Sequence, residues 1–422
     1  MDHNKFLSPR FMDNVERLPV SVGLAWSNSP SALYDVPNSR YMLDFWGDEG
    51  VASLGYGQNF NQFLDDFMRR SIPHRLPDVY PNGIRNQAAE AICSRTGMDK
   101  IFFASSGTEA NEAAIKLARK YWWDKEQYHG SKFASYRHYV FTLEGNFHGR
   151  TGFSLAASDY RQSPYHRQGF GPIPQGFGVL NDNLEVVDFD GNSVAGDSWT
   201  DTLLKKTAAV IMAPVLGNNV VKTYPSEFWD RLQKLREKYG FLLIFDDVQA
   251  GSGRSGYYAT YQGLPCIKRP DIMTLSKGMA MGLPMSAMLA SEEVAKSFTR
   301  GVHFNTFGGT ILCCYLAIEF YKWLDENLPE VKEKGERIRK EFSNRSWIRH
   351  YDGMGLMNAF RPLFDKYDGF DFVNKAREFG LFLVTHRKDG MIRFTPPMNV
   401  TYKEIDSAFK ILDMTHESLF LG

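Results

Sequence analysis

The sequence lacks long apolar segments, a cysteine framework and an excess of charge of either sign. No run of about 18 apolar residues occurs, so a membrane span is not expected, and the first residues carry no signal-peptide hydrophobic region. The four cysteines show no Cys-x-x-Cys spacing, which argues against a metal site and suits a reducing compartment. The 49 Lys and Arg residues balance 49 Asp and Glu residues, so no overall field attracts nucleic acid or an anionic membrane. We expect a cytoplasmic protein without metal, nucleic-acid or membrane partners.

The apolar content, by contrast, is ample for a large folded protein. The chain has 422 residues, of which 43% are hydrophobic and 14% aromatic. This length exceeds what a single core usually reaches, so a large domain with a smaller one is expected. In the middle of the chain, short apolar segments alternate with amphipathic helical patterns. Strands are expected at 100–104, 138–143, 208–213, 241–245 and 272–276, with helices at 108–123 and 226–238. Such alternation predicts an α/β fold with a mostly parallel sheet flanked by helices, whose ligand lies beyond the carboxyl ends of the strands.

The two ends of the chain have a different pattern. Expected elements are a hairpin of 31–36 with 41–46, helices at 59–70, 84–96, 311–327, 331–342 and 371–379, a strand-like region at 347–360, and paired strands at 381–385 and 391–395. We therefore divide the chain into residues 1–55, an amino-terminal segment joining the small domain, 56–310, the large domain, and 311–422, a smaller α+β domain.

The most unusual charge in the sequence is Lys277. It is the only charged residue between Asp271 and Glu292, after a strand-like apolar segment and before a glycine-rich turn. Burial disfavours the ammonium form, and a lysine with a lowered pKa becomes an amine nucleophile that forms Schiff bases with carbonyls. A lysine that lays its stem over the turn and keeps its ammonium in water explains this segment alone equally well.

A strand followed directly by Ser106-Gly107-Thr108 and a helix predicts an anion site. The free amides and the dipole of a helix amino terminus attract an anion, and the hydroxyl groups add donors. The alternative is an ordinary helix cap made by Ser106 or Thr108, which is the commoner use of this pattern.

Asp246 and Asp247 end the apolar strand at 241–245. Adjacent strand residues point to opposite faces, so the two carboxylates do not form an acid/base pair. One carboxylate aimed into a site would keep a pyridine nitrogen protonated. The alternative, favoured for Asp247, is that the carboxylate caps the following loop.

Several further side chains stand just past predicted strands. Phe147 and His148 could stack on a flat ligand, and Arg150 and Arg393 each offer a guanidinium fork suited to a carboxylate. The loop at Thr306 provides glycines and hydroxyls able to meet a phosphate. Each feature also has an ordinary structural explanation, such as a packed aromatic or an edge-strand ion pair. Their joint chemistry is that of a pyridoxal-phosphate site.

At this point the chain resembles the class III (ornithine/acetylornithine-type) aminotransferases, which are fold-type I pyridoxal-phosphate enzymes. Six motifs match the family in order. They are Ser105-Ser-Gly-Thr-Glu-Ala-Asn-Glu-Ala-Ala-Ile-Lys-Leu-Ala-Arg119, Phe147-His-Gly-Arg-Thr151, Leu242-Leu-Ile-Phe-Asp-Asp-Val-Gln249, Leu275-Ser-Lys-Gly278, Thr306-Phe-Gly-Gly309 and Ile392-Arg-Phe-Thr-Pro-Pro397. The resemblance implies a homodimer with shared active sites and pyridoxal 5'-phosphate as the cofactor.

The resemblance also implies a role for each matched residue. Lys277 would be the Schiff-base lysine and proton carrier, and Asp246 would bond the pyridine nitrogen. The implied cofactor contacts are Ser106, Gly107, Thr108, Phe147, His148, Asp246, Val248, Gln249, Lys277 and, from the neighbouring subunit, Thr306. Arg393 would bind a substrate carboxylate, and Arg150 a second carboxylate on a dicarboxylate such as 2-oxoglutarate.

Two departures from the family pattern concern the substrate. Asn218 stands where ornithine-type enzymes carry a glutamate that can neutralise the arginine matching Arg393. This substitution resembles the glutamate-semialdehyde aminomutases and predicts that Arg393, with no carboxylate to mask it, binds substrate carboxylates in both half-reactions. Glu49 falls near the mouth of the predicted pocket, where an acid would favour a cationic, diamine-like donor. A solvated loop acid is the alternative.

These patterns together predict an aminotransferase that moves an amino group from an ω-amino or diamino acid to a 2-oxo acid by a ping-pong mechanism. An aminomutase or a decarboxylase on the same scaffold is the alternative within enzymes. A pseudoenzyme used as a binding scaffold is the alternative outside them, and the presence of both Lys277 and Asp246 argues against it.

Overall fold

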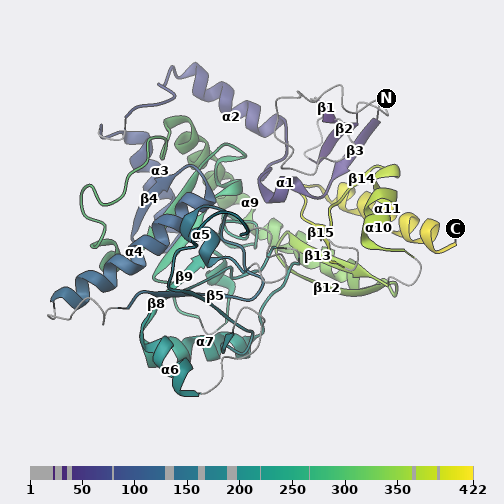
Figure 1. Cartoon of the computed structure of the whole chain (residues 1–422). Coiled ribbons are helices and arrows are strands. Elements are labelled where there is room, and N and C mark those ends of the chain that lie inside the picture. Colours follow the sequence, from purple (N-terminus) through teal and green to yellow (C-terminus); the bar gives the residue numbers. More distant parts are fainter. Residues whose placement is uncertain are drawn as a thin grey trace.

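The computed structural model describes residues 22–23, 31–35, 40–77, 80–128, 137–159, 167–187, 197–218, 220–265, 267–363, 367–386 and 390–421. Its largest sheet has eight strands in the order β4-β11-β10-β9-β8-β5-β6-β7 (Figure 1). Their bounds are β4 Lys100–Ala104, β5 Tyr139–Leu143, β6 Phe177–Leu180, β7 Val186–Val187, β8 Thr207–Met212, β9 Leu242–Asp246, β10 Ile272–Leu275 and β11 Ser286–Ala290. Strands β10, β9, β8, β5 and β6 pair in parallel, and β11 and β7 pair antiparallel with their neighbours. The mostly parallel sheet is as predicted.

Successive residues of the central strands enter two different cores. In β8, Ala209 and Ile211 pack in one hydrophobic cluster, whereas Val210 and Met212 pack in the other. Helix α4 (Gly107–Tyr128) contributes to the first cluster and α7 (Ser226–Tyr239) to the second. Since neighbouring strand side chains point to opposite faces, a strand covered on both faces is buried along its whole length and mostly apolar, as β8 to β11 are.

The remaining helices of this region lie around the sheet (Figure 1). They are α2 (Gln58–Arg69), α3 (Gly83–Thr96), α5 (Gly152–Ala157), α6 (Asp197–Lys205) and α8 (Glu292–Ala295), with short 3-10 turns η4 (Thr260–Gly263) and η5 (Lys277–Ala280).

Helix α9 (Ile311–Ser343) connects the large sheet with the carboxyl-terminal elements. It contacts α2, α3 and η5 of the large-sheet region, and it also contacts β12 (Ile348–Met354) and β13 (Met357–Pro362). The sequence predicted two helices here, but α9 runs through Pro329 as one helix of 33 residues. Proline removes one backbone hydrogen bond, and buried side chains on both sides of it, such as Leu324 and Val331, keep the helix packed.

Two smaller sheets join distant parts of the chain. One orders β1 (Val22–Gly23), β2 (Ala32–Asp35), β3 (Arg40–Asp44) and β14 (Leu381–Phe382), and the other orders β12, β13 and β15 (Ile392–Phe394). The predicted antiparallel pairing of β2 with β3 is confirmed. The predicted pairing of 381–385 with 391–395 is confirmed only in part: within the described residues one antiparallel bridge joins Val384 to Arg393, while β14 pairs in parallel with β3 and β15 pairs with β13.

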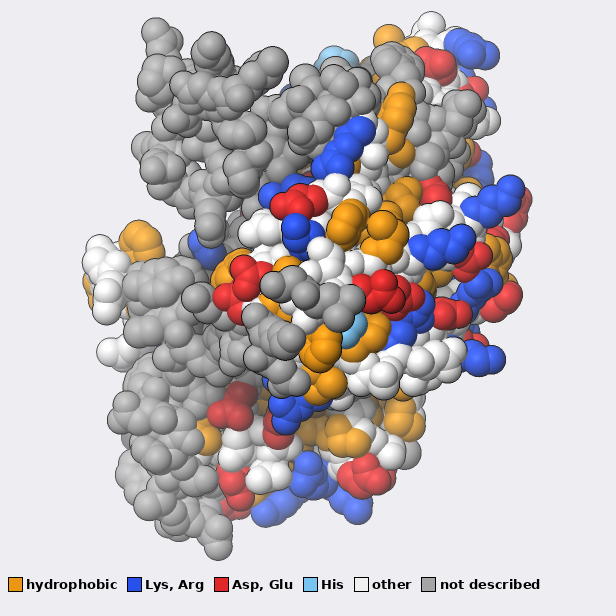
Figure 2. Space-filling view, turned by 90° about the vertical axis from the view of Figure 1, so that its right-hand side faces the viewer, with side chains coloured by type: hydrophobic (Ala, Val, Ile, Leu, Met, Phe, Trp, Pro, Cys, Tyr) orange, Lys and Arg blue, Asp and Glu red, His pale blue; other side chains and the backbone are white. Residues whose placement is uncertain are grey.

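Helices α10 (Gly369–Glu378) and α11 (Tyr402–Leu421) complete the carboxyl-terminal part, and the sequence patterns missed α11. On the face drawn in Figure 2, the described lysine and arginine side chains intermingle with aspartates and glutamates. Across the described residues, none of the helices has the length and apolar character needed to cross a bilayer.

Candidate active site

Lys277 and Asp246 meet where two neighbouring parallel strands end. Residue Asp246, the last of β9, is in register with Thr274 of β10, and Lys277 opens η5 two residues after β10. Lys277 has a left-handed φ of 46°, and its Nζ donates to the backbone oxygen of Glu49 at 3.0 Å. Burial lowers the pKa of Lys277 to about 8, with Arg393 adding to the decrease and Glu49 opposing it. The amine is therefore bonded inside the molecule and loses its proton more easily than an ordinary lysine.

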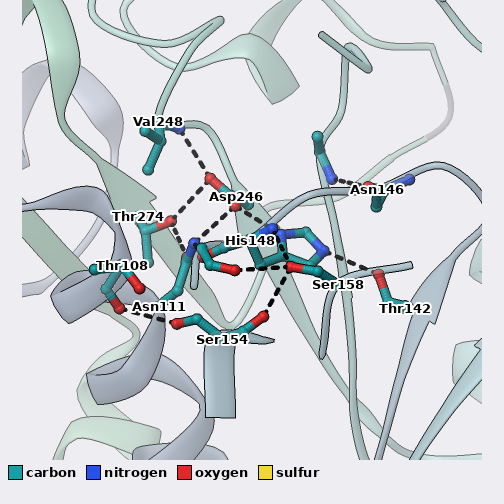
Figure 3. A network of polar contacts seen from close by, with 12 residues as sticks. Thr108, Asn111, Thr142, Asn146, His148, Ser154, Ser158, Asp246, Val248 and Thr274 are labelled. Carbon is teal, nitrogen blue, oxygen red and sulfur yellow. Dashed lines mark hydrogen bonds and ion pairs between the residues drawn. The ribbon is translucent and has the colours of Figure 1, made fainter. Parts of the chain in front are cut away.

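Asp246 is fixed by donors from three elements (Figure 3). Its Oδ2 accepts from Asn111 Nδ2 of α4 at 2.8 Å and lies 2.6 Å from His148 Nδ1. Its Oδ1 accepts from the backbone amide of Val248 at 3.2 Å. The other ring nitrogen of His148 lies 2.9 Å from Thr142 Oγ1. His148, which is 1% exposed, therefore has both nitrogens engaged and orients Asp246.

Asp247 points the other way, into the protein. Its carboxylate accepts from the amide and the hydroxyl group of Thr260 at 2.7 and 2.6 Å. Burial raises the pKa of Asp247 to about 7 in spite of these hydrogen bonds. The two adjacent aspartates thus have different surroundings, as their alternating directions require.

The raised pKa of Asp247 predicts how the free energy of unfolding depends on pH. The folded protein retains a proton on Asp247 that the unfolded chain releases near pH 4, so the free energy of unfolding falls as pH rises from about 4 to about 7. Asp247→Asn, which resembles the protonated acid, should show a smaller fall. Denaturant unfolding of both proteins across this range measures the difference, in which all other titrating groups cancel. Equal slopes for the two proteins would contradict the assignment.

The amino terminus of α4 lies beside Lys277 and Asp246. The backbone amides of Ser105 and Ser106 donate to Glu109 Oε2 at 2.9 and 2.8 Å, so an acidic side chain of the first turn already uses them. Thr108 Oγ1 lies 2.8 Å from Thr151 Oγ1. The amides of Gly107 and Thr108, one step further into the helix, belong to the first-turn donors that an α-helix leaves unpaired.

The glycines around this terminus let the backbone pack closely against neighbouring side chains, where a Cβ would not fit. A Cβ on Gly107 would lie 2.9 Å from Val248 Cγ1, and one on Gly149 would lie 2.2 Å from Thr108 Oγ1. Phe147 is 39% exposed although it stands next to the buried His148. An amine, an oriented carboxylate and a helix amino terminus with glycine at its first position fit pyridoxal 5'-phosphate.

Arg393 is not the unmasked arginine that the sequence predicted. It is 4% exposed, its Nη1 is bonded to Glu49 Oε2, and its Nη2 donates to the backbone oxygen of Gly217. Asn218 instead donates from Nδ2 to the backbone oxygen of Gly145 at 3.5 Å. The carboxylate missing at position 218 is thus replaced by one from Glu49, 344 residues before Arg393 in the chain.

Glu49 is consequently not a solvated loop acid. Burial alone would raise the pKa of Glu49, but the hydrogen bond with His386 and the charges of Arg393 and Lys277 hold it well below its ordinary value. The backbone oxygen of Glu49 also accepts from Gln249 Nε2 at 3.1 Å. Glu49 therefore contacts the amine, the arginine and the glutamine of the predicted site.

The other predicted residues lie further out. The guanidinium carbon of Arg150 is 6.0 Å from the centre of the Phe147 ring. Thr306 is exposed, and its backbone oxygen accepts from Arg75 Nη2 at 3.1 Å. Neither residue forms part of the hydrogen-bond network around Asp246 that Figure 3 draws.

Sequence reasoning missed Asn111, Thr274 and His386. Asn111 links the site to β10, since its Oδ1 accepts from Thr274 Oγ1 at 2.8 Å while its Nδ2 reaches Asp246. Asn111 lies within the first of the six motifs and stands four residues after Gly107, one helical turn along α4. This spacing was the sequence signal that could have placed Asn111 on the same side of the helix as Gly107. No local pattern marks His386.

A mostly parallel sheet that brings a lysine and a carboxylate together at its carboxyl edge is typical of fold-type I pyridoxal-phosphate transferases. The family model of class-III aminotransferases matches residues 26–415, and the chain belongs to this family. The acetylornithine aminotransferase of Aquifex aeolicus is 34% identical over 405 residues, covering 95% of this chain and 98% of that protein. The enzyme of the same name from Methanocaldococcus jannaschii is 30% identical over 387 residues, covering 90% of each.

Solved structures share the fold. The ornithine aminotransferase of Toxoplasma gondii ME49 superposes with a TM-score of 0.82 at 23% identity, covering 99% of this chain and 93% of that one. An (S)-enantioselective omega-transaminase from Thermomicrobium roseum gives 0.77 at 23% identity, covering 95% and 93%. The chain is a pyridoxal-phosphate-dependent aminotransferase, whose substrates are an amino donor and a 2-oxo acid.

Proposed function

We propose that this aminotransferase takes an amino group from an ω-amino or diamino acid and passes it to a dicarboxylic 2-oxo acid such as 2-oxoglutarate. The observation that carries the proposal is the ion pair of Glu49 with Arg393 beside Lys277. With its charge neutralised, Arg393 does not attract an α-carboxylate toward the reacting amine. A donor whose reacting amino group has no adjacent carboxylate fits this arrangement, and the names of the acetylornithine-type relatives agree with it.

The residues of the site would share the work as follows. Pyridoxal phosphate, when bound, supplies an electron sink for the carbon that loses its proton. Asp246 would keep a proton on the ring nitrogen, and Lys277 would carry a proton at Nζ between the carbons that exchange it. Gly107, Thr108 and Ser106 would hold the phosphate at the helix terminus.

Further contacts would hold the ring and the acceptor. Phe147 and Val248 would lie against the two ring faces, and Gln249 would reach the ring oxygen. Arg393 and Arg150 would bind the two carboxylates of the acceptor. Gln249 Nε2 donates to the backbone oxygen of Glu49, whose carboxylate holds Arg393, so the ring and the arginine would be connected through Glu49.

We also infer a homodimer in which Thr306 reaches the phosphate of the neighbouring subunit. In support, the loop that carries Thr306 exposes two large aromatic side chains, Phe304 at 65% and Phe307 at 63%. Exposed aromatic groups of this size are enriched at protein interfaces.

A cytoplasmic location agrees with Cys93 and Cys313, which form no disulfide.

A panel of donors tests the proposed reaction. The holoenzyme is mixed with N-acetylornithine, ornithine, a diamine or an α-amino acid, and the visible absorbance of the bound cofactor is followed before and after 2-oxoglutarate is added. We expect ω-amino donors to convert the cofactor to its amine form at least tenfold faster than α-amino acids, and 2-oxoglutarate to restore it with release of glutamate. Faster conversion by α-amino acids would contradict the proposed donor class.

The aminomutase alternative is kept by one observation, the Gly217-Asn218 pair that resembles glutamate-semialdehyde aminomutases. An aminomutase isomerises a single substrate and needs no external oxo acid. Continued product formation from one amino-ketone substrate in the absence of any 2-oxo acid would favour it over the proposed transfer.

A further inference from the structure

Glu49 occupies a turn of left-handed residues whose backbone is held by hydrogen bonds. Residues Gly47, Asp48, Glu49 and Gly50 all have left-handed φ values, of 61°, 49°, 57° and 86°. Non-glycine residues keep this conformation only where surrounding contacts enforce it. Here the carbonyl of Glu49 accepts from Lys277 and Gln249, which holds the main chain in place.

The two carboxylate oxygens of Glu49 face different partners. Oε2 is bonded to the buried Arg393, whereas Oε1 lies 3.5 Å from His386 Nε2 and 3.4 Å from Trp46 Nε1. The Trp46 ring is fixed edge-on against Phe382, with ring centres 5.7 Å apart. His386 is 39% exposed in its side chain, so this second set of partners lies toward the outside.

An arriving carboxylate can bind Arg393 only by displacing Glu49 Oε2. A carboxylate that leaves its arginine inside a protein needs other donors, because an unpaired buried charge is costly. The indole and imidazole nitrogens already lie beside Glu49, within reach of a side-chain rotation that leaves the backbone of the turn unchanged. The exchange therefore needs no movement of the sheet or of Lys277.

We propose that His386, with Trp46, receives the Glu49 carboxylate when the carboxylate of the oxo acid takes its place on Arg393. The inference rests on the proposed function, because it assumes an acceptor that brings a carboxylate to Arg393. His386 is then a positioning residue: it sets the affinity for the acceptor through Glu49 and does not touch the acceptor itself.

Binding of glutarate to the holoenzyme tests the exchange. Glutarate has both carboxylates of the acceptor but no oxo group, so calorimetry measures binding without reaction. Glu49→Gln should bind glutarate about tenfold more tightly than the wild type, because the competing masked state is removed. His386→Gln should bind it about threefold more weakly, because the displaced carboxylate loses a partner.

The double variant separates this role from direct contact or a general structural effect. In the Glu49→Gln background there is no carboxylate to receive, so His386→Gln should change the dissociation constant less than twofold. Asp48→Asn, on the neighbouring left-handed residue, is the matched control and should bind glutarate as the wild type does. Thermal unfolding checks that all variants fold.

Equal weakening by His386→Gln in both backgrounds, or an unchanged affinity in Glu49→Gln, would overturn the inference. The donor panel decides the proposed function separately. If the enzyme transfers amino groups to 2-oxoglutarate but the effects of the two substitutions on glutarate binding simply add, only the proposed exchange is disproved. If the single and double variants bind glutarate as expected but the enzyme transfers no amino group to 2-oxoglutarate, only the proposed acceptor is disproved.

Discussion

Lys277→Ala is expected to lower kcat for amino transfer by about 10⁴-fold, the upper range for removing a positioned proton-transfer group. The substitution removes the amine that donates to the Glu49 carbonyl, which is the group that burial brings to a pKa of about 8. An amine of this pKa changes protonation state readily near neutral pH, which is what a proton carrier needs. Steady-state rates with an ω-amino donor and 2-oxoglutarate measure the loss.

Added methylamine should restore part of the rate, because it can enter the space left by the lysine and carry the proton. Such rescue separates a lost proton carrier from a misfolded site. Lys334→Ala is a control at another lysine, since Lys334 is buried, at 4% exposed, and is paired with Glu330 on α9. We expect the control to retain its kcat. A Lys277→Ala enzyme that keeps more than about a tenth of the wild-type rate would show that another group moves the proton.

The local chemistry of the site was predictable because it follows from short segments of sequence. A lone lysine in an apolar stretch and an aspartate ending an apolar strand stand out from their neighbours, and parallel strands bring their carboxyl ends to one edge. The strand that ends at Asp246 and the strand that precedes Lys277 were placed within one or two residues for the same reason. Hydrophobic periodicity and the expected burial of apolar residues are visible within a few residues of sequence, so these elements can be predicted directly.

The surroundings of Arg393 were not predictable in this way. Its partner comes from the opposite end of the chain, and the pairing depends on the β3–β14 and β13–β15 contacts, which the sequence patterns did not predict. Glu49 itself has a backbone conformation that its residue type disfavours, so local preference argued against its position. Substrate choice thus depends on the contacts that only the tertiary fold establishes.

Asp246→Asn is expected to lower kcat by about 10³-fold, the effect of removing one charged group that faces developing charge. The carboxylate is the acceptor for Asn111 and His148, and its negative charge is what would keep the cofactor nitrogen protonated. An amide of the same shape still fills the space and still accepts a hydrogen bond, but it cannot offset a positive charge. The half-reaction with an ω-amino donor, followed through the cofactor absorbance, isolates this step from acceptor binding.

Asp247→Asn is the control for this substitution, because it makes the same change one residue later on the opposite face of the strand. Asp247 bonds Thr260 and is half protonated near pH 7, so an amide there should alter stability with pH but leave the half-reaction rate within about threefold. Equal rate losses in the two variants would mean that the strand end is sensitive to any change of charge. A loss confined to Asp246→Asn requires the carboxylate to act toward the cofactor side, where Asn111 and His148 orient it.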